Sequence, residues 1–509
     1  MRLKQLIEQP CGLKYMIDNL DTHSGFARRM ILDTEMPTDV RIINANYQIL
    51  KQFYDVVNNQ ENQNQINNLQ FKLCNLKEIG CTITHLRNKY VLDDIELFEV
   101  KHLAMLAGEV QVVMNSLQLG ESIFIPNLEE VVRILDPDGM KIASFYIYDS
   151  YSPRLMELRR IMKAKDDFDE ALFSEMTSIE DEVRAKLSMQ LSKFADELEA
   201  AQKALAFIDL NLAKAYQMIK YNLCFPIISE DGTTEYEGLF NPEVKDALEQ
   251  RNRTFQPVDI TFWNKPTLIT GANMGGKTVV LKTLTLCQYL FQFGFGIPAT
   301  KAKVDLKDEI YFCMGDEQSI EKGLSSFAAE MKNIDAVIKA SRGKRKILAL
   351  IDEPARTTNP KEGTALVSAL VKVLEVENVS LVMTTHYDIE PTDSRRLRVK
   401  GFENGSMNYE LVEVKDGEVP HEALNIAESL GIDKEWIETA REILNIPNSV
   451  QLESLSDLNM ANSPYLNLIS SLIVPNSVYL ESPSPSQSIP YQYPSFQQYS
   501  KPHAVLRRL

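Results

Sequence analysis

A glycine-rich turn between an apolar strand and a helix constrains this chain most. Residues 265–280 read Lys-Pro-Thr-Leu-Ile-Thr-Gly-Ala-Asn-Met-Gly-Gly-Lys-Thr-Val-Val, so Gly271-x-x-x-x-Gly276-Lys277-Thr278 directly follows a short strand. This is the Walker A spacing in the context that a phosphate-binding loop requires. Glycine lets the backbone curl so that its N–H groups face phosphate oxygens, and the positive end of the next helix favours an anion. The segment therefore predicts binding of a nucleoside triphosphate.

The individual residues of this loop have distinct expected roles. Lys277 is expected to reach the β- and γ-phosphates, and the Thr278 hydroxyl is expected to bind Mg²⁺. The other candidate nucleotide contacts precede Lys277 and are Gly271, Ala272, Asn273, Met274, Gly275 and Gly276.

A second apolar strand ends in two carboxylates. Lys346-Ile-Leu-Ala-Leu-Ile-Asp352-Glu353 has the Walker B pattern. Asp352 is expected to hold Mg²⁺, directly or through water, and Glu353 is expected to orient and deprotonate the attacking water. A buried strand that ends in solvated acids is the structural alternative. The phosphate loop upstream favours the catalytic interpretation.

Two further segments are candidates for the same site. The strand Ser380-Leu-Val-Met-Thr-Thr-His386 ends in a histidine that would sense the γ-phosphate or position the water; a purely structural histidine is the alternative. Ser325 and Ser326 precede an apparent helix, which makes an anion-ready terminus or, more plainly, a helix cap.

Length and composition limit the class of protein. A chain of 509 residues should hold two to four domains. Its net charge of -17 disfavours non-specific DNA binding by the whole surface. The N-terminus lacks the apolar stretch of a signal peptide, and no run of 18 apolar residues is present. The scattered cysteines have no metal-ligand spacing, so we expect reduced thiols in a cytoplasmic protein: Cys11, Cys74, Cys81, Cys224, Cys287 and Cys313.

The texture of the sequence predicts an α+β multidomain chain. Residues 1–140 have helical periodicity and should form a helical domain, and 141–222 should form long helices. Short β-branched strands alternate with helices across 223–445, which is typical of an α/β P-loop domain. The Ser-, Pro- and Gln-rich segment 446–509 is expected to be a disordered tail.

Four motifs in this order resemble the MutS family of ATPases. Thr270-Gly-Ala-Asn-Met-Gly-Gly-Lys-Thr278 is similar to the family's TGPNMGGKS/T, with Ala272 in place of proline. Ser325-Ser-Phe-Ala-Ala-Glu-Met331 resembles STFxxEM, and Asp352-Glu-Pro-Ala-Arg-Thr-Thr-Asn-Pro-Lys-Glu-Gly363 resembles DELGRGTSxxDG. Thr384-Thr-His-Tyr387 is similar to ATHY. The resemblance covers roughly residues 10–445.

This resemblance implies more than the motifs themselves. It implies an N-terminal all-α lever region, a C-terminal ABC-like ATPase domain, and ATP with Mg²⁺ as cofactors. It further implies a head-to-tail homodimer in which Ser325 of one protomer contacts the γ-phosphate bound by the other. Phe255 falls where the family stacks an aromatic ring on adenine.

Departures from the family pattern leave the cargo open. No mismatch-reading domain is expected before the lever and no Smr nuclease after the ATPase, although Gly315-Asp-Glu-Gln-Ser-Ile-Glu resembles the Smr-bearing branch. Between Leu158 and Leu198 there is no room for the family's DNA clamp. Ala355-Arg-Thr-Thr-Asn-Pro360 looks more like the ATPase subunit of the lysine 5,6-aminomutase reactivating factor. Remodelling of a protein client and a DNA repair or recombination role both remain, with a scaffold lacking turnover as a third possibility.

Overall fold

The computed structural model describes residues 1–142, 144–164, 169–271, 275–314, 326–387, 389, 393–403, 406–414 and 431–444. The chain forms two compact units, Met1–Glu438 and Thr439–Leu509. Of the second unit, the described residues are the end of α17 (Lys434–Leu444), and the predicted tail 446–509 lies outside them. The six cysteines are free thiols, and none of the described helices has the length and apolarity of a membrane span.

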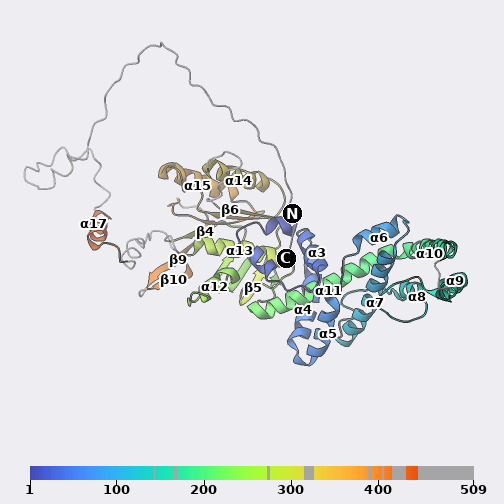
Figure 1. Cartoon of the computed structure of the whole chain (residues 1–509). Coiled ribbons are helices and arrows are strands. Elements are labelled where there is room, and N and C mark those ends of the chain that lie inside the picture. The colour runs from blue at the N-terminus through green and yellow to red at the C-terminus, as the bar shows by residue number, and fades with distance from the viewer. Residues whose placement is uncertain are drawn as a thin grey trace, which may run out of the picture. The chain divides into compact units, whose positions relative to one another are not determined.

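Helices joined by loops make up the described residues as far as Tyr221 (Figure 1). The helical periodicity of residues 1–140 predicted such helices, and the long helices expected within residues 141–222 occupy the end of this region. The α-helices are α1 (Leu3–Leu6), α2 (Leu13–Asp18), α3 (Gly25–Asp33), α4 (Val40–Asn58), α5 (Gln63–Leu73), α6 (Gly80–Arg87), α7 (Asp94–Ser116), α8 (Glu129–Leu135), α9 (Pro153–Ala164), α10 (Glu170–Leu191) and α11 (Ala195–Tyr221). Short 3₁₀ turns are η1 (Gln60–Asn62), η2 (Asp149–Tyr151) and η3 (Ser192–Phe194).

α4 illustrates why these residues form helices. The Asp39 side chain accepts a hydrogen bond from the Arg41 N–H and so satisfies one of the unpaired donors at the helix start. Ile43, Tyr47 and Leu50 follow at spacings of three and four and are buried. The sequence thus sets both the start of the helix and the face that packs inward.

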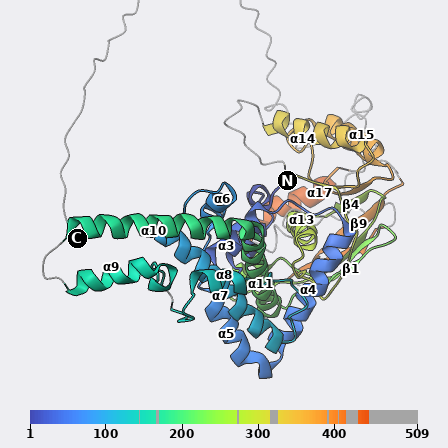
Figure 2. The same ribbon diagram turned by 90° about the vertical axis from the view of Figure 1, so that its right-hand side faces the viewer.

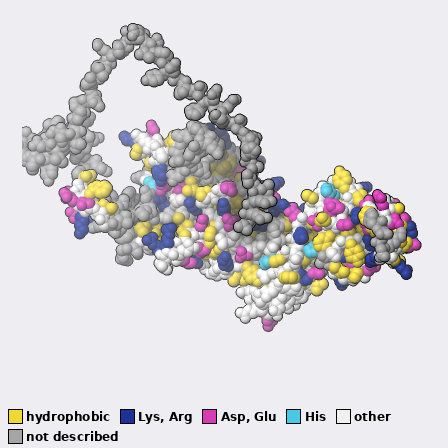
Figure 3. Space-filling model, viewed as in Figure 1, with side chains coloured by type: hydrophobic (Ala, Val, Ile, Leu, Met, Phe, Trp, Pro, Cys, Tyr) yellow, Lys and Arg dark blue, Asp and Glu magenta, His cyan; other side chains and the backbone are white. Residues whose placement is uncertain are grey.

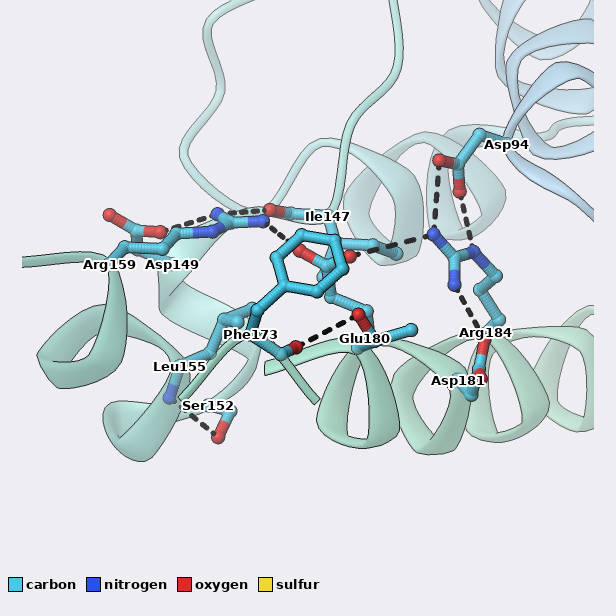
Figure 4. A network of polar contacts seen from close by, with 11 residues as sticks. Asp94, Ile147, Asp149, Ser152, Leu155, Arg159, Phe173, Glu180, Asp181 and Arg184 are labelled. Carbon is cyan, nitrogen blue, oxygen red and sulfur yellow. Dashed lines mark hydrogen bonds and ion pairs between the residues drawn. The ribbon is translucent and has the colours of Figure 1, made fainter. Parts of the chain in front are cut away.

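Ion pairs connect the long helices of this region. Arg159 on α9 donates to Asp149 at 2.6 Å and to Glu180 on α10 at 2.7 Å. Arg184 on α10 donates to Asp94 in the first turn of α7 at 2.8 Å, and it lies 3.8 Å from Glu180 (Figure 4). Because both guanidinium groups are more than half covered, these pairs are less screened than surface pairs. The Arg159–Glu180 pair joins α9 to α10, which lie side by side in Figure 2, and the Arg184–Asp94 pair joins α10 to α7.

A largely parallel sheet follows in the second half of the chain. In the described residues its strand order is β10-β9-β4-β8-β7-β6, and only the β9–β10 pair is antiparallel. The strands are β4 (Thr267–Thr270), β6 (Glu309–Met314), β7 (Ile347–Asp352), β8 (Val379–Thr384), β9 (Arg395–Glu403) and β10 (Ser406–Glu413). β4, β7 and β8 lie where the sequence predicted strands. Ile269 pairs with Thr384, and Ile351 pairs with Met383, so all three strands end at the same edge.

Helices cover both faces of this sheet. Ile347, Ala349 and Ile351 of β7 point to the face covered by α14 (Ser326–Ser341) and α15 (Pro360–Leu374). Leu348 and Leu350 belong to the other face, which is covered by α13 (Lys277–Gln292) (Figure 1). Burial on both faces explains why this strand is apolar throughout rather than alternating.

In the described residues a second sheet combines three strands that precede the phosphate loop in sequence with one that follows it. Its described strands have the order β1-β5-β2-β3, and they are β1 (Ile227–Ile228), β2 (Thr234–Leu239), β3 (Val258–Phe262) and β5 (Lys301–Val304). The helix α12 (Pro242–Glu249) connects β2 and β3. The sequence did not identify these strands individually, although residues from 223 onward were expected to belong to the α/β domain.

Side chains of the helical region hold the end of α13. Lys214 of α11 is buried and donates to the Phe293 carbonyl at 2.7 Å. Burial lowers the pKa of Lys214 to about 7. The Tyr47 hydroxyl of α4 hydrogen bonds to the carbonyls of Phe291 and Phe295 at 3.1 and 2.8 Å. Carbonyls in the last turn of α13 and just after it thus accept hydrogen bonds from residues far away in sequence.

Candidate nucleotide-binding site

The phosphate loop joins β4 to α13. β4 ends at Thr270 and α13 begins at Lys277, as the Walker A pattern predicted. Gly271 and Gly276 have φ angles of 129° and 73°, which side-chain-bearing residues rarely adopt. Three predicted nucleotide contacts, Ala272, Asn273 and Met274, lie outside the described residues, whereas Gly275 is described.

Tyr409 of β10 packs against this loop. A Cβ atom on Gly276 would lie 3.1 Å from its ring. The Tyr409 N–H donates to Gln256 Oε1 at 3.0 Å, and Gln256 also donates to Asn408 at 2.9 Å. These bonds tie the segment that follows Phe255 to the strand beside the phosphate loop. Phe255 is half-buried and packs against the main hydrophobic core.

Lys277 is buried at the centre of the site. Its side chain is 4% exposed, and its Nζ donates to the Gly271 carbonyl at 2.8 Å. The same Nζ lies 3.4 Å from Glu353 Oε1 and 3.5 Å from His386 Nε2. The structure therefore brings together residues from all three predicted strand tips.

The carboxylate of Asp352 accepts two hydroxyl groups. Thr278 donates to Asp352 Oδ2 at 2.8 Å, and Thr384 donates to Asp352 Oδ1 at 2.6 Å. The Thr384 hydroxyl also accepts the backbone N–H of Glu353 at 2.9 Å. Sequence reasoning missed this role of Thr384. The one feature of the sequence that could have pointed to it is that Thr384 ends a predicted strand, as Asp352 does.

Thr278 and Asp352 suit a magnesium ion chemically. Mg²⁺ prefers hard oxygen ligands and is commonly bound by one or two carboxylates together with substrate phosphates. The hydroxyl and the carboxylate are already 2.8 Å apart. Among the described residues, no group of three His, Cys, Asp or Glu side chains is arranged to hold a metal ion.

Glu353 and His386 make the shortest side-chain contact among the described groups of the site. Glu353 Oε1 lies 2.5 Å from His386 Nε2, and the Glu353 side chain is 13% exposed. The hydrogen bond to His386 lowers the pKa of Glu353 to about 2, with Lys277 contributing and burial opposing. Arg356 adds a weaker contact at 3.5 Å. Glu353 is therefore held as a carboxylate.

This pKa predicts how stability depends on pH. The pKa of Glu353 is lower in the folded protein than its ordinary 4.5, so its contribution is present above about pH 4.5. The contribution should be lost as the pH falls from about 4.5 towards about 2. We expect the difference in unfolding free energy between wild type and Glu353→Gln to shrink over this range in denaturant titrations. A pH-independent difference would contradict the ion pair.

Ser325, expected to contact a partner's nucleotide, lies outside the described residues. α14 begins at the next residue, Ser326. The helix thus begins at the second serine of the pair, and the position of Ser325 stays a prediction.

Comparison with known proteins gives one matching domain and a set of relatives. Residues 267–446 match MutS domain V, which is an ATPase domain. The chain is 33% identical over 271 residues to "Endonuclease MutS2" of Caldicellulosiruptor saccharolyticus, covering 51% of this chain and 33% of the relative. It is 31% identical over 286 residues to "Endonuclease MutS2" of Ligilactobacillus salivarius, covering 54% and 35%. The chain thus spans about a third of the length of the curated relatives that it matches. Residues 267–446 thus resemble MutS domain V, and Thr278, Asp352 and His386 of the site lie within this match.

Proposed function

We propose that this chain binds and hydrolyses ATP with Mg²⁺. The observation that carries the proposal is that Lys277, Asp352 and Glu353 meet at one edge of the sheet. Lys277 lies 3.4 Å from Glu353 and 3.5 Å from His386, and His386 lies 2.5 Å from Glu353. Thr278 lies 2.8 Å from Asp352. A scaffold without turnover would have no need to bury a lysine between a carboxylate and a histidine at this edge.

Each residue has a chemical role in this reaction. The phosphate loop binds the phosphates through backbone N–H groups and Lys277. Thr278 and Asp352 would hold the metal ion, which supplies charge neutralisation at the phosphates. Glu353 orients a water molecule and accepts its proton, and before the substrate binds His386 holds the Glu353 carboxylate in place.

The electrostatics of the site suggest when Glu353 becomes a base. Its pKa of about 2 makes it a poor proton acceptor while His386 and Lys277 contact it. A triphosphate competes for the Lys277 ammonium and for His386, because phosphate oxygens are strong acceptors. Losing these contacts raises the pKa of Glu353 towards the range in which a general base works. Bound substrate thus activates its own base.

The proposed assembly is a head-to-tail homodimer. Ser325 of one protomer would contact the γ-phosphate bound by the other, and Phe255 would stack on adenine. The link from Gln256 to Tyr409 at the phosphate loop supports this placement of Phe255. The proposed domain limits are 1–140 and 141–222 for the helical lever, 223–445 for the ATPase and 446–509 for the tail.

For the cargo we propose a protein client, of the class of adenosylcobalamin-dependent lysine aminomutases. Two observations favour a client over DNA. The net charge is -17, and Figure 3 shows acidic and basic side chains interspersed on the face it presents. α9 ends at Ala164 and α10 begins at Glu170, so the chain has no long insertion between these helices.

The alternative is DNA repair or recombination control, favoured by the name "endonuclease" that the relatives carry. Binding of the full chain to labelled duplex and four-way-junction DNA across salt concentrations distinguishes the two. The client proposal predicts no saturable binding even at low salt. A nanomolar Kd that weakens steeply with salt would overturn it, because phosphate contacts release counterions.

A further inference from the structure

The turn after Glu353 has an unusual backbone. Glu353 and Ala355 have φ angles of 43° and 60°, although neither is glycine. A Cβ atom makes this left-handed region unfavourable, so such residues persist only where neighbouring groups hold them. Ala355 is also buried, at 1% exposure. A strained, buried turn therefore follows directly on the residue that would act as the base.

Two side chains bind Ala355, one on each side of the residue. Glu330 of α14 accepts the Ala355 N–H at 3.0 Å. The Tyr387 hydroxyl donates to the Ala355 carbonyl at 2.6 Å. The two polar backbone groups of one strained residue are therefore both satisfied by side chains from other elements.

These two side chains are themselves well fixed. Glu330 is 6% exposed, and burial raises its pKa while the Ala355 N–H opposes that rise. The Tyr387 N–H donates to the Thr385 hydroxyl at 3.0 Å. A Cβ on Gly363 would overlap the Tyr387 hydroxyl, so the glycine in α15 leaves the space this ring needs. The phenol can reach Ala355 only because position 363 lacks a side chain.

We propose that Glu330 and Tyr387 are positioning residues that hold the turn at Ala355 and thereby aim the Glu353 carboxylate for hydrolysis. This inference rests on the proposed ATPase activity. Neither residue reaches the expected phosphate position in its described contacts. Their effect passes through the backbone of two residues, from Ala355 to Glu353.

The geometry predicts a specific kinetic pattern. Loss of either hydrogen bond to Ala355, from Glu330 or from Tyr387, lets Ala355 relax to a negative φ. This displaces Glu353 but leaves Lys277 and Thr278 in place. Tyr387→Phe should lower kcat roughly five- to tenfold, the size expected for one hydrogen bond, with KM for ATP unchanged. Glu330→Leu should do the same, whereas Glu330→Gln keeps an acceptor oxygen and should turn over near the wild-type rate.

Ala355→Gly gives the sharpest test, because glycine adopts a positive φ without steric cost. Added to Tyr387→Phe, it should restore much of the lost kcat. Tyr311→Phe is the matched control. Like Tyr387, Tyr311 packs against the buried apolar residues of the sheet face covered by α14 and α15, but its hydroxyl donates to Glu309 at 2.9 Å, away from the turn. This control should turn over at the wild-type rate.

Steady-state kinetics and thermal melting of the full-length variants decide the matter. A wild type that turns over ATP together with an unaffected Tyr387→Phe would overturn the positioning role alone. So would a Tyr387→Phe loss that Ala355→Gly fails to restore, or one matched by an equal rise in KM. A wild type without turnover would overturn the proposed function and the positioning role with it.

Discussion

Replacing Glu353 by glutamine is expected to leave ATP bound and to reduce turnover at least about a hundredfold, the usual contribution of a general base. The amide keeps the shape of the side chain but cannot accept a proton at neutral pH. Phosphate release from purified protein measures the turnover, and titration with a fluorescent ATP analogue measures binding.

Glu362→Gln is the matched control for this substitution. Glu362 lies in the first turn of α15 and is exposed, so its loss should leave both turnover and binding unchanged. Turnover of Glu353→Gln at the rate of this control would show that Glu353 is not the base.

Replacing Lys277 by alanine should weaken ATP binding by roughly a hundredfold, because it removes a charge-assisted contact to the phosphates. The buried ammonium faces Glu353, so its removal also leaves that carboxylate with one fewer cation. Equilibrium titration of ATP measures the effect.

A lysine on the same helix provides the comparison. Lys282→Ala truncates a half-buried side chain further along α13, and this variant should bind ATP as the wild type does. Equal weakening by both substitutions would indicate damage to the helix rather than loss of a phosphate contact.

Much of the site could be predicted because its chemistry is written in local sequence. Asp352 and His386 stand at or just after the ends of apolar strands, and Lys277 closes the glycine-rich loop that follows a third strand. These parallel strands end at one edge of the sheet, so the structure brings the three residues together. Thr384 and Tyr387 were not assigned roles. Their functions depend on which strands are neighbours and on the path of a turn, and neither is encoded in a local pattern.

For the fold, too, some strands could be predicted from the sequence and others could not. β7 and β8 were predictable because they are buried on both faces and read as continuous apolar runs. The strands of the second sheet were not, because they are short and half-exposed. Thr234-Glu-Tyr-Glu-Gly-Leu239 has only two large apolar residues, and its partners β3 and β5 lie on either side of the phosphate loop in sequence.

The contacts at the end of α13 have a mechanical consequence. A helix of 16 residues is a stiff rod about 24 Å long. Its first residue, Lys277, lies at the expected phosphate site, and carbonyls at its far end accept hydrogen bonds from Lys214 and Tyr47. A tilt of the rod must therefore either break those bonds or carry α11 and α4 with it. A displacement of the phosphate-binding end of α13 is therefore transmitted to the helical region at its other end.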